Sequence, residues 1–306
     1  VRRAAWARKR FEAGAARIGV VVPDLQRRRK EVVRVFARAM RPDFNLPGAA
    51  PAALPFNVSL GEPLAAAPLV AFALAFLDFA LHDVEFERAS RLLRSPFLGG
   101  AESELAARAQ LDALLRRKAT ARTSLPKLIA RIERCPLLRA RLEAAFAVKA
   151  TGRTPHDWAQ YCTAVLAAVG FPGERSLDSA EFQARERFHA LLGEFAQLAS
   201  VVPRLSSQEA LARLRRLCAE TLFQPEAPAA PVQVLGLLES AGLEFDCLWV
   251  AGLTDEAWPL AARPHPLLPV ALQKRVGIPE AAAETSLALD RRLTVLARRG
   301  EHHFRS

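Results

Sequence analysis

Hydrophobic positions change their spacing along the chain, and this change separates three parts. Near the start, residues 17–23 are a short β-branched run closed by a proline, which predicts a buried strand of a parallel sheet. Residues 25–40 then place apolar side chains at helical spacing, with Asp24 in position to cap that helix. Much further along, the apolar runs 232–236 and 247–252 predict two more strands. Alternation of strands and helices is typical of an α/β domain.

The segment between these parts, residues 64–222, has helical spacing almost throughout and no sustained strand-like alternation. Clear helix starts punctuate it. Thr154 and Asp157 flank a proline at the first position of one predicted helix, and Ser206 with Glu209 predicts a capping box at the start of another. We therefore expect a helical domain here.

The order of these parts predicts an α/β fold with a large all-α insertion. Each α/β piece alone is too small to cover both faces of a sheet, so one discontinuous α/β domain is the economical interpretation. We expect residues 1–60 to be its first part, residues 61–225 to be the helical insertion, and residues 226–306 to be its second part, with a helix over 284–297. Because the chain begins at Val1 rather than Met, we also expect a piece of a longer polypeptide.

Membrane, metal and disulfide chemistry have little support in the sequence. The longest apolar run, residues 64–77, is too short for a membrane span and predicts a buried core helix. The four cysteines lie in apolar stretches without Cys-x-x-Cys spacing, which predicts buried thiols in a reducing compartment. The six histidines show no metal-ligand spacing. We expect a cytoplasmic protein that binds neither metal nor membrane.

The chain is strongly basic. The formal net charge is +11 and the sequence pI is about 10.4. Residues 1–41 alone contain thirteen Lys or Arg against three Asp or Glu. A chain this basic often binds a polyanion, and nucleic acid is the expected partner. The alternative is that the basic residues form solvated surfaces without a partner.

Two basic groups are candidate DNA contacts, because Lys and Arg neutralise phosphates. The first group is Arg27, Arg28, Arg29 and Lys30, and the second, in the helical part, is Arg91, Arg94, Arg116, Arg117 and Lys118. Among the aromatic residues, Trp6 and Trp258 are candidates to stack on bases, whereas Phe11 and Trp249 are expected to pack in the core.

The sequence contains no complete set of catalytic residues for ATP hydrolysis or nucleic-acid cleavage. A Walker A loop needs a Lys followed by Ser or Thr, and none of the six lysines has such a neighbour. A magnesium-dependent nuclease needs clustered carboxylates. The adjacent Asp255 and Glu256 are expected to form a surface turn instead. We therefore predict no catalytic residue and no cofactor within this chain.

A resemblance to a known family appears around the second pair of predicted strands. Gly-Leu-Glu-Phe at 242–245, an apolar strand after it, Gly252-Leu253 and then Trp258-Pro259 resemble motif V of superfamily 1 helicases. The closer similarity is to the AddB-like subfamily of DNA repair proteins, and it extends from about residue 4 to residue 306. Further segments similar to that subfamily are 92–100, 158–173 and 266–269.

The resemblance implies a discontinuous RecA-like 2A domain that contains a helical 2B-like domain. It implies nucleotide-binding roles for Gln26, Arg28, Gly242 and Glu244. Where active helicases have His and Lys in motif V, this chain has Leu238 and Ala241, so a degenerate site is implied. ATP and Mg²⁺ would then bind only with domains of the parent protein that lie outside this chain.

These observations together predict a helicase-like piece of a bacterial DNA repair helicase–nuclease that binds DNA or serves as a scaffold in double-strand-end processing. The resemblance implies an AddA-type helicase subunit, or a nuclease domain on the same polypeptide, as a protein partner, and a location at the nucleoid. Two alternatives stay open. The chain is a docking module without DNA contact, or it is half of an ATPase site that uses Arg28 and Glu244.

Overall fold

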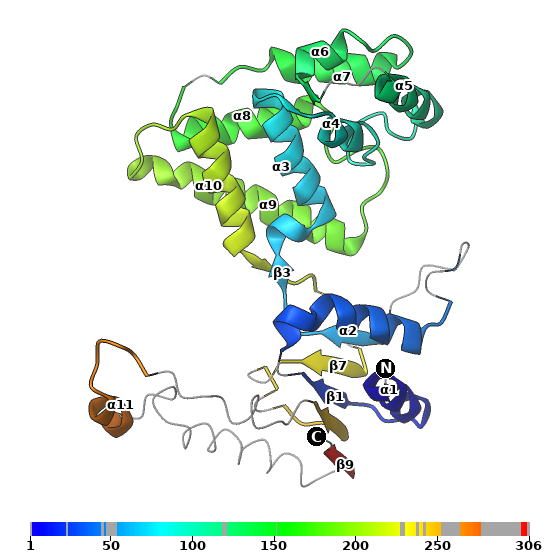
Figure 1. Ribbon diagram of the computed structural model, residues 1–306, viewed down its shortest axis with the longest axis vertical. Helices are drawn as coiled ribbons and strands as arrows, with labels where there is room; N and C mark the ends of the chain where they lie inside the picture. Colours follow the sequence, from blue (N-terminus) through cyan, green and yellow to red (C-terminus); the bar gives the residue numbers. More distant parts are fainter. Residues whose placement is uncertain are drawn as a thin grey trace. The chain divides into compact units, whose positions relative to one another are not determined.

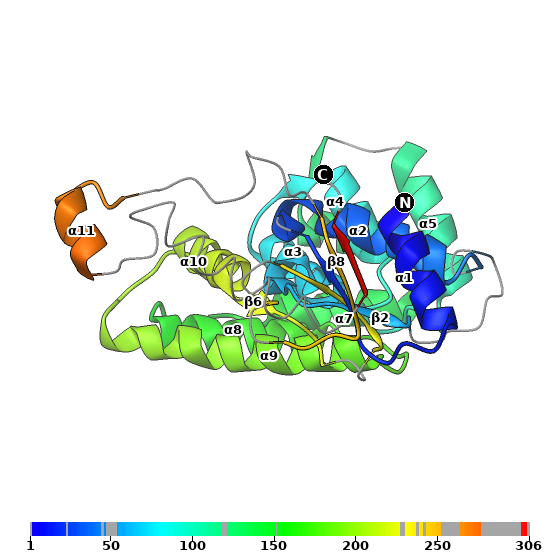
Figure 2. The same ribbon diagram turned by 90° about the horizontal axis from the view of Figure 1, so that it is seen from below.

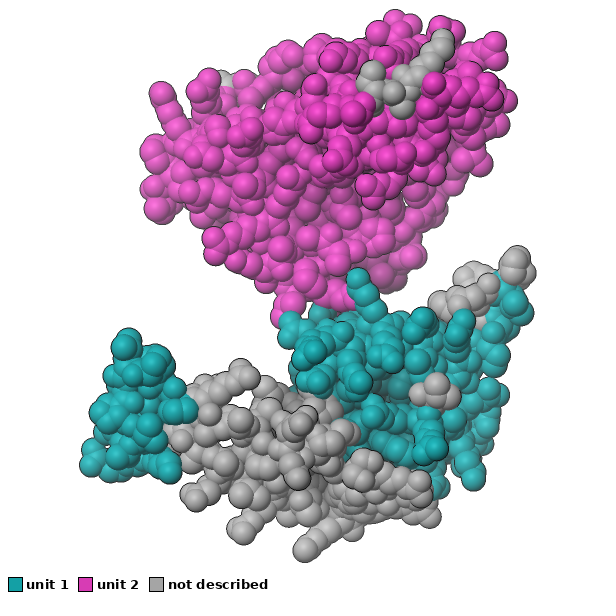
Figure 3. Space-filling view, in the orientation of Figure 1, with its two compact units in different colours: residues 1–61, 227–306 teal, residues 62–226 magenta. Residues whose placement is uncertain are grey.

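The protein forms two compact units in the computed structural model (Figure 3). Unit 1 comprises residues 1–61 and 227–306, and unit 2 comprises residues 62–226. The structure describes residues 2–22, 24–43, 46, 54–117, 121–150, 152–226, 230–236, 239–240, 243–251, 264–276 and, for the backbone alone, 301–304.

Unit 1 contains a parallel sheet assembled from distant segments of the chain. Its strands are β1 (Ile18–Val21), β2 (Phe56–Val58), β7 (Val232–Leu235), β8 (Cys247–Val250) and β9 (Glu301–Phe304). Their order is β2–β7–β1–β8–β9, and every neighbouring pair is parallel (Figure 1). In the centre, Ile18 aligns with Val232 on one side and with Cys247 on the other. The predicted mixed α/β class is therefore confirmed.

Two helices of unit 1, α1 (Arg2–Glu12) and α2 (Leu25–Met40), pack on one face of this sheet. The shared apolar cluster includes Val20 of β1, Phe36 of α2 and Val234 of β7. The range predicted for α2 is confirmed. Asp24 occupies the N-cap position of α2, but its side chain makes no capping hydrogen bond. A third helix, α11 (Val270–Val276), belongs to the same unit.

The opposite face of the sheet has close packing at Gly19. A Cβ atom at this position would lie 2.8 Å from atoms of both Phe245 and Leu248. Phe245 packs there against the buried side chains of Val21, Leu248 and Val250. Only glycine leaves enough room for an aromatic ring this near to the middle of the central strand.

Unit 2 consists mainly of helices. They are η1 (Leu64–Ala66), α3 (Pro68–Leu81), α4 (Phe86–Leu93), α5 (Leu105–Arg117), α6 (Leu125–Ile129), α7 (Pro136–Ala147), α8 (Pro155–Ala168), α9 (Ser179–Gln197), η2 (Leu198–Ser200) and α10 (Ser207–Glu220). Two short antiparallel pairs, which the sequence did not predict, join β3 (Glu62–Pro63) to β6 (Leu222–Phe223) and β4 (Val84–Glu85) to β5 (Arg122–Thr123).

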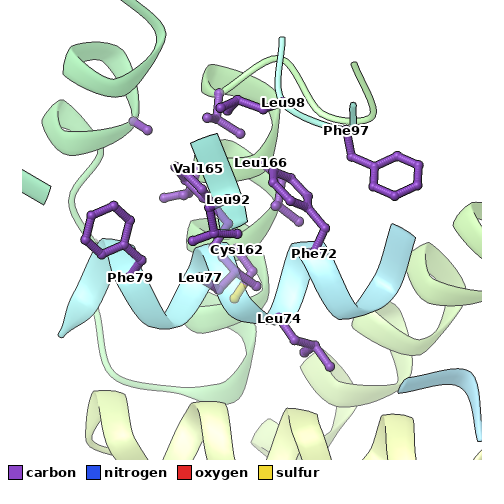
Figure 4. Packing of buried hydrophobic residues seen from close by; sticks show 14 of the residues in the cluster. Phe72, Leu74, Leu77, Phe79, Leu92, Phe97, Leu98, Cys162, Val165 and Leu166 are labelled. Atoms are coloured by element: carbon purple, nitrogen blue, oxygen red, sulfur yellow. The ribbon is translucent and has the colours of Figure 1, made fainter. Parts of the chain in front are cut away.

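Helix α3 lies at the centre of the core of unit 2. Eight of its fourteen residues are buried, and they point in several directions around the helix, which is expected of a helix surrounded by others. Figure 4 shows Phe72, Leu77 and Phe79 of α3 among Cys162 and Leu166 of α8. The prediction of a buried core helix is confirmed for this run. Among the described residues, no helix is both long enough and apolar enough to span a membrane.

The helix-start signals in unit 2 are confirmed. Thr154 and Asp157 form a reciprocal capping box at α8, and Ser206 and Glu209 form one at α10. Helix α9, which lies alongside α8 (Figure 2), starts with a third capping box that the sequence analysis missed. That box uses Asp178 rather than Ser or Thr as the capping residue.

Candidate nucleic-acid interface

The basic side of α2 is exposed because its other side packs on the sheet. Leu25, Phe36 and Ala37 are buried, so residues on the opposite side of the helix face solvent. The exposed cations on that side are Arg27, Lys30, Arg34 and Arg38, and we call them the α2 stripe. Their spacing of three or four residues places them along one line of the helix surface.

Charge on the α2 stripe is not neutralised by nearby acids. Within the described part of the chain, none of its four cations forms an ion pair or a side-chain hydrogen bond. Glu31, also exposed, is the one acidic residue within α2 itself. An exposed row of unpaired cations creates a positive potential that attracts polyanions.

The structure divides the first predicted basic group between different sides of α2. Arg27 and Lys30 belong to the α2 stripe, but the Nε atom of Arg29 donates a hydrogen bond to the carbonyl oxygen of Leu60 over 2.7 Å. The charge of Arg28 affects Arg3 of α1. Burial lowers the pKa of Arg3, and electrostatic repulsion by Arg28 lowers that pKa further. Arg29 therefore connects α2 to the segment after β2.

Sequence reasoning missed Arg34 and Arg38 as members of this surface. A run of consecutive cations draws attention to residues 27–30, yet consecutive helical residues point in different directions. The signal that identifies the surface is instead the helical spacing of cations from Arg27 through Arg34 to Arg38.

The second predicted basic group is largely engaged within unit 2. Arg94 and Arg116 both pair with the buried carboxylate of Asp112, at 3.4 and 3.0 Å. Arg116 also pairs with Glu87 at 2.9 Å, and the hydrogen bond from Arg116 to Asp112 raises the pKa of the arginine. Arg117 is exposed at the end of α5, and Lys118 lies outside the described residues. Arg94 and Arg116 are thus already held by carboxylates, unlike the α2 stripe.

The aromatic candidates are arranged differently from the sequence expectation. Trp6 packs edge to face against Trp249, with ring centroids 5.3 Å apart, so these two rings contact each other on the α1 side of the sheet. Phe11 was expected in the core, but it is 39% exposed because it lies on the outer side of the last turn of α1. Trp258 lies outside the described residues.

The residues implied for nucleotide binding are not brought together by the described part of the chain. Gln26 and Arg28 lie in the first turns of α2, after the carboxyl end of β1. Glu244 is exposed three residues before β8, which runs parallel to β1, so it precedes the amino end of the adjacent strand. Gly242 lies outside the described residues.

The thiols and potential metal ligands add no further chemistry to this surface. Three of the four cysteines are buried, and none forms a disulfide. Burial raises the pKa of Cys162 and of Cys218 to about 12. Across the described residues, no three His, Cys, Asp or Glu side chains gather in a way that would hold a metal ion.

Comparison with known proteins leaves the family open. No protein-family model matches this sequence, and a search of curated proteins finds none that is significantly similar.

Proposed function

We propose that this chain binds DNA through the α2 stripe, as the helicase-like part of an AddB-like DNA repair helicase–nuclease. The observation that carries the proposal is a row of four exposed cations that have no ion-pair or hydrogen-bond partner among the described residues, in a chain of net charge +11. Paired cations would have to leave a carboxylate before they could bind a phosphate, whereas cations of the α2 stripe would displace only water and small counterions.

The dimensions of the α2 stripe suit a nucleic-acid backbone. Eleven residues separate Arg27 from Arg38, so the row is about 16 Å long at a rise of about 1.5 Å per residue. Duplex DNA carries roughly one negative charge per 1.7 Å of its axis, so about ten phosphates lie along such a length. Arginine adds geometric fit, because its planar guanidinium can donate to two phosphate oxygens at once.

The path of the chain supports the helicase-like part of the proposal. The chain leaves unit 1 after a strand of the parallel sheet, forms the mainly helical unit 2, and returns to the same sheet at β7. A RecA-like 2A domain with a helical 2B-like domain would follow the same path. In this proposal, ATP and Mg²⁺ would require an upstream domain that supplies the phosphate-binding loop, and a helicase subunit or nuclease domain would be the protein partner.

The test is fluorescence anisotropy of the protein with single-stranded, duplex and forked DNA over a range of salt concentrations. Four phosphate contacts predict that the logarithm of the duplex association constant falls with the logarithm of salt concentration with a slope of roughly −3.6. Single-stranded DNA should give a shallower slope, of roughly −2.8. Absence of binding even at low salt would contradict the proposal and favour a docking module without DNA contact.

A further inference from the structure

Three side chains of unit 2 form a hydrogen-bonded chain that has no part in the proposed DNA surface. His82 directly follows α3, and its Nδ1 atom lies 3.0 Å from Oδ1 of Asp78, one helical turn earlier. The Nε2 atom of the same ring lies 3.2 Å from Oγ of Ser207, the first residue of α10. The order is therefore carboxylate, imidazole and hydroxyl, with one ring nitrogen facing each oxygen-bearing group.

The carboxylate end of this chain is held in its ionised form. The side chain of Asp78 is only 13% exposed, and its Oδ2 atom forms ion pairs with Arg88, at 3.1 Å from Nη1, and with Arg215, at 2.7 Å from Nη2. Burial alone would raise the pKa of Asp78, but hydrogen bonds from Arg215 and His82 and the two guanidinium charges lower it below the ordinary value. An ionised carboxylate can only accept, so Nδ1 of a neutral His82 donates and Nε2 is left to accept from Ser207.

The hydroxyl end lies at the N-terminus of a fourteen-residue helix. The hydroxyl of the capping residue Ser206 accepts from the backbone N–H of Glu209. The backbone N–H groups of Ser207 and Gln208 have no acceptor among the described residues. Unpaired N–H groups at the positive end of a helix can stabilise an oxyanion that forms beside them.

A pocket of about 350 Å³ lies beside the Asp78–His82 end of this hydrogen-bonded chain; Ser207 is not among its lining residues, but Gln208, the next residue, is. Asp78 and His82 line it from the end of α3, while Gln208 and Leu211 line it from α10. Arg122 and Val84 contribute from the short β4–β5 pair. Such a volume is at the lower end of the range for sites that bind small molecules.

We propose that Ser207, His82 and Asp78 form a Ser–His–Asp triad that hydrolyses small carboxylic esters at the N-terminus of α10, beside this pocket. Ser207 Oγ adds to the ester carbonyl carbon while its proton passes to Nε2 of His82. The bond to the alcohol oxygen then breaks, and the alcohol leaves with that proton. Water adds to the acyl–serine with the same proton transfers, which releases the carboxylic acid and restores Ser207. Asp78 holds the imidazole in the reactive tautomer throughout.

The test uses a fluorophosphonate probe, which phosphonylates activated serines, together with p-nitrophenyl acetate hydrolysis. We expect mass spectrometry to find the modification on Ser207, and we expect Ser207→Ala to remove both the labelling and the hydrolysis. His82→Gln should lower the rate of both by about 10²-fold or more, the usual contribution of a general base. Ser200→Ala is the matched control, because the Ser200 hydroxyl bonds to the carbonyl of Gln197 and not to a histidine.

Two results would overturn the triad. One is no modification at Ser207 in the wild-type protein, and the other is labelling of Ser207 that is equally fast in His82→Gln. Circular dichroism of each variant checks that unit 2 keeps its helices. The outcome is independent of the proposed DNA binding, because substitutions in the α2 stripe leave all three triad residues in place.

Discussion

Replacing Glu104 by alanine should destabilise unit 2 strongly. The Glu104 carboxylate is only 8% exposed, and its two oxygens accept the backbone N–H groups of Leu137 and Leu138 at 2.8 and 2.9 Å. Those N–H groups belong to the first turn of α7, where no helical carbonyl can accept them. The same carboxylate lies 3.6 Å from the buried guanidinium of Arg108. One side chain thus caps α7 and neutralises a buried cation.

The magnitude follows from what the substitution leaves behind. Glu104→Ala leaves two backbone N–H groups of α7 without their acceptor and the buried guanidinium of Arg108 without its counter-charge. Breaking a buried ion pair from one side typically costs about 3–5 kcal/mol, and we expect a loss in that range rather than the sum of all contacts. Arg108→Met should cost less, because Nε and Nη1 of Arg108 have no hydrogen-bond acceptor among the described residues.

The assay is urea denaturation followed by circular dichroism, since unit 2 contains most of the described helices. Glu143→Ala is the matched control, because its pair with Arg139 is about half exposed and should contribute under about 1 kcal/mol. The reasoning would be refuted if Glu104→Ala cost no more than Glu143→Ala. It would also fail if Arg108→Met were as destabilising as Glu104→Ala.

Local features of the structure lead to four more expected outcomes. In the native protein, a thiol reagent at mildly alkaline pH should modify Cys247 first and leave Cys162 intact until denaturation, because burial raises the pKa of Cys162 to about 12; equal rates would contradict this. Because the folded pKa of Asp78 is lowered, its contribution to stability is present above the ordinary carboxyl pKa of about 4 and is lost as pH falls through the lowered value. Asp78→Asn should therefore flatten the acid limb of a stability–pH curve, and an unchanged limb would oppose that assignment. Gly193→Ala, at an exposed position inside α9 with no atom near the added methyl group, should stabilise by about 1 kcal/mol in thermal melts. Gly173→Ala should instead destabilise, since φ is +97° and Cβ would lie 2.1 Å from a backbone oxygen; stabilisation there would contradict the argument.

Local signals in the sequence were sufficient to predict many of the elements. The capping boxes at Thr154 and Ser206 depend on side chains three residues apart, so sequence alone identifies them. Strands β1, β7 and β8 are short and mainly apolar, with Gln233 of β7 as the one polar residue among them, so sequence alone identifies them as strands. In contrast, the order of these strands depends on contacts between residues more than two hundred positions apart, such as Ile18 with Val232.

The candidate surfaces were harder to predict, because they depend on which side of each element is buried. The consecutive cations 27–30 were identified, but only packing against the sheet shows that Arg29 turns toward Leu60. Pairing of Arg116 of α5 with Glu87 of α4 likewise depends on how α4 and α5 pack. No sequence spacing connects His82 with Ser207, which lie 125 residues apart, so the three-residue hydrogen-bonded chain had no sequence signal.

The most direct test of the DNA-binding account compares two quadruple variants with equal loss of charge. One replaces the four cations of the α2 stripe by glutamine, and the other replaces Arg139, Arg185, Arg187 and Arg216, each of which pairs with a glutamate. The measurement is anisotropy with duplex DNA over a salt series, which gives the slope of the logarithm of the association constant against the logarithm of salt concentration. This slope is predicted to change from roughly −3.6 to near zero in the first variant and to stay near the wild-type value in the second. Equal weakening in both variants, or no change in the first, would contradict DNA binding through α2.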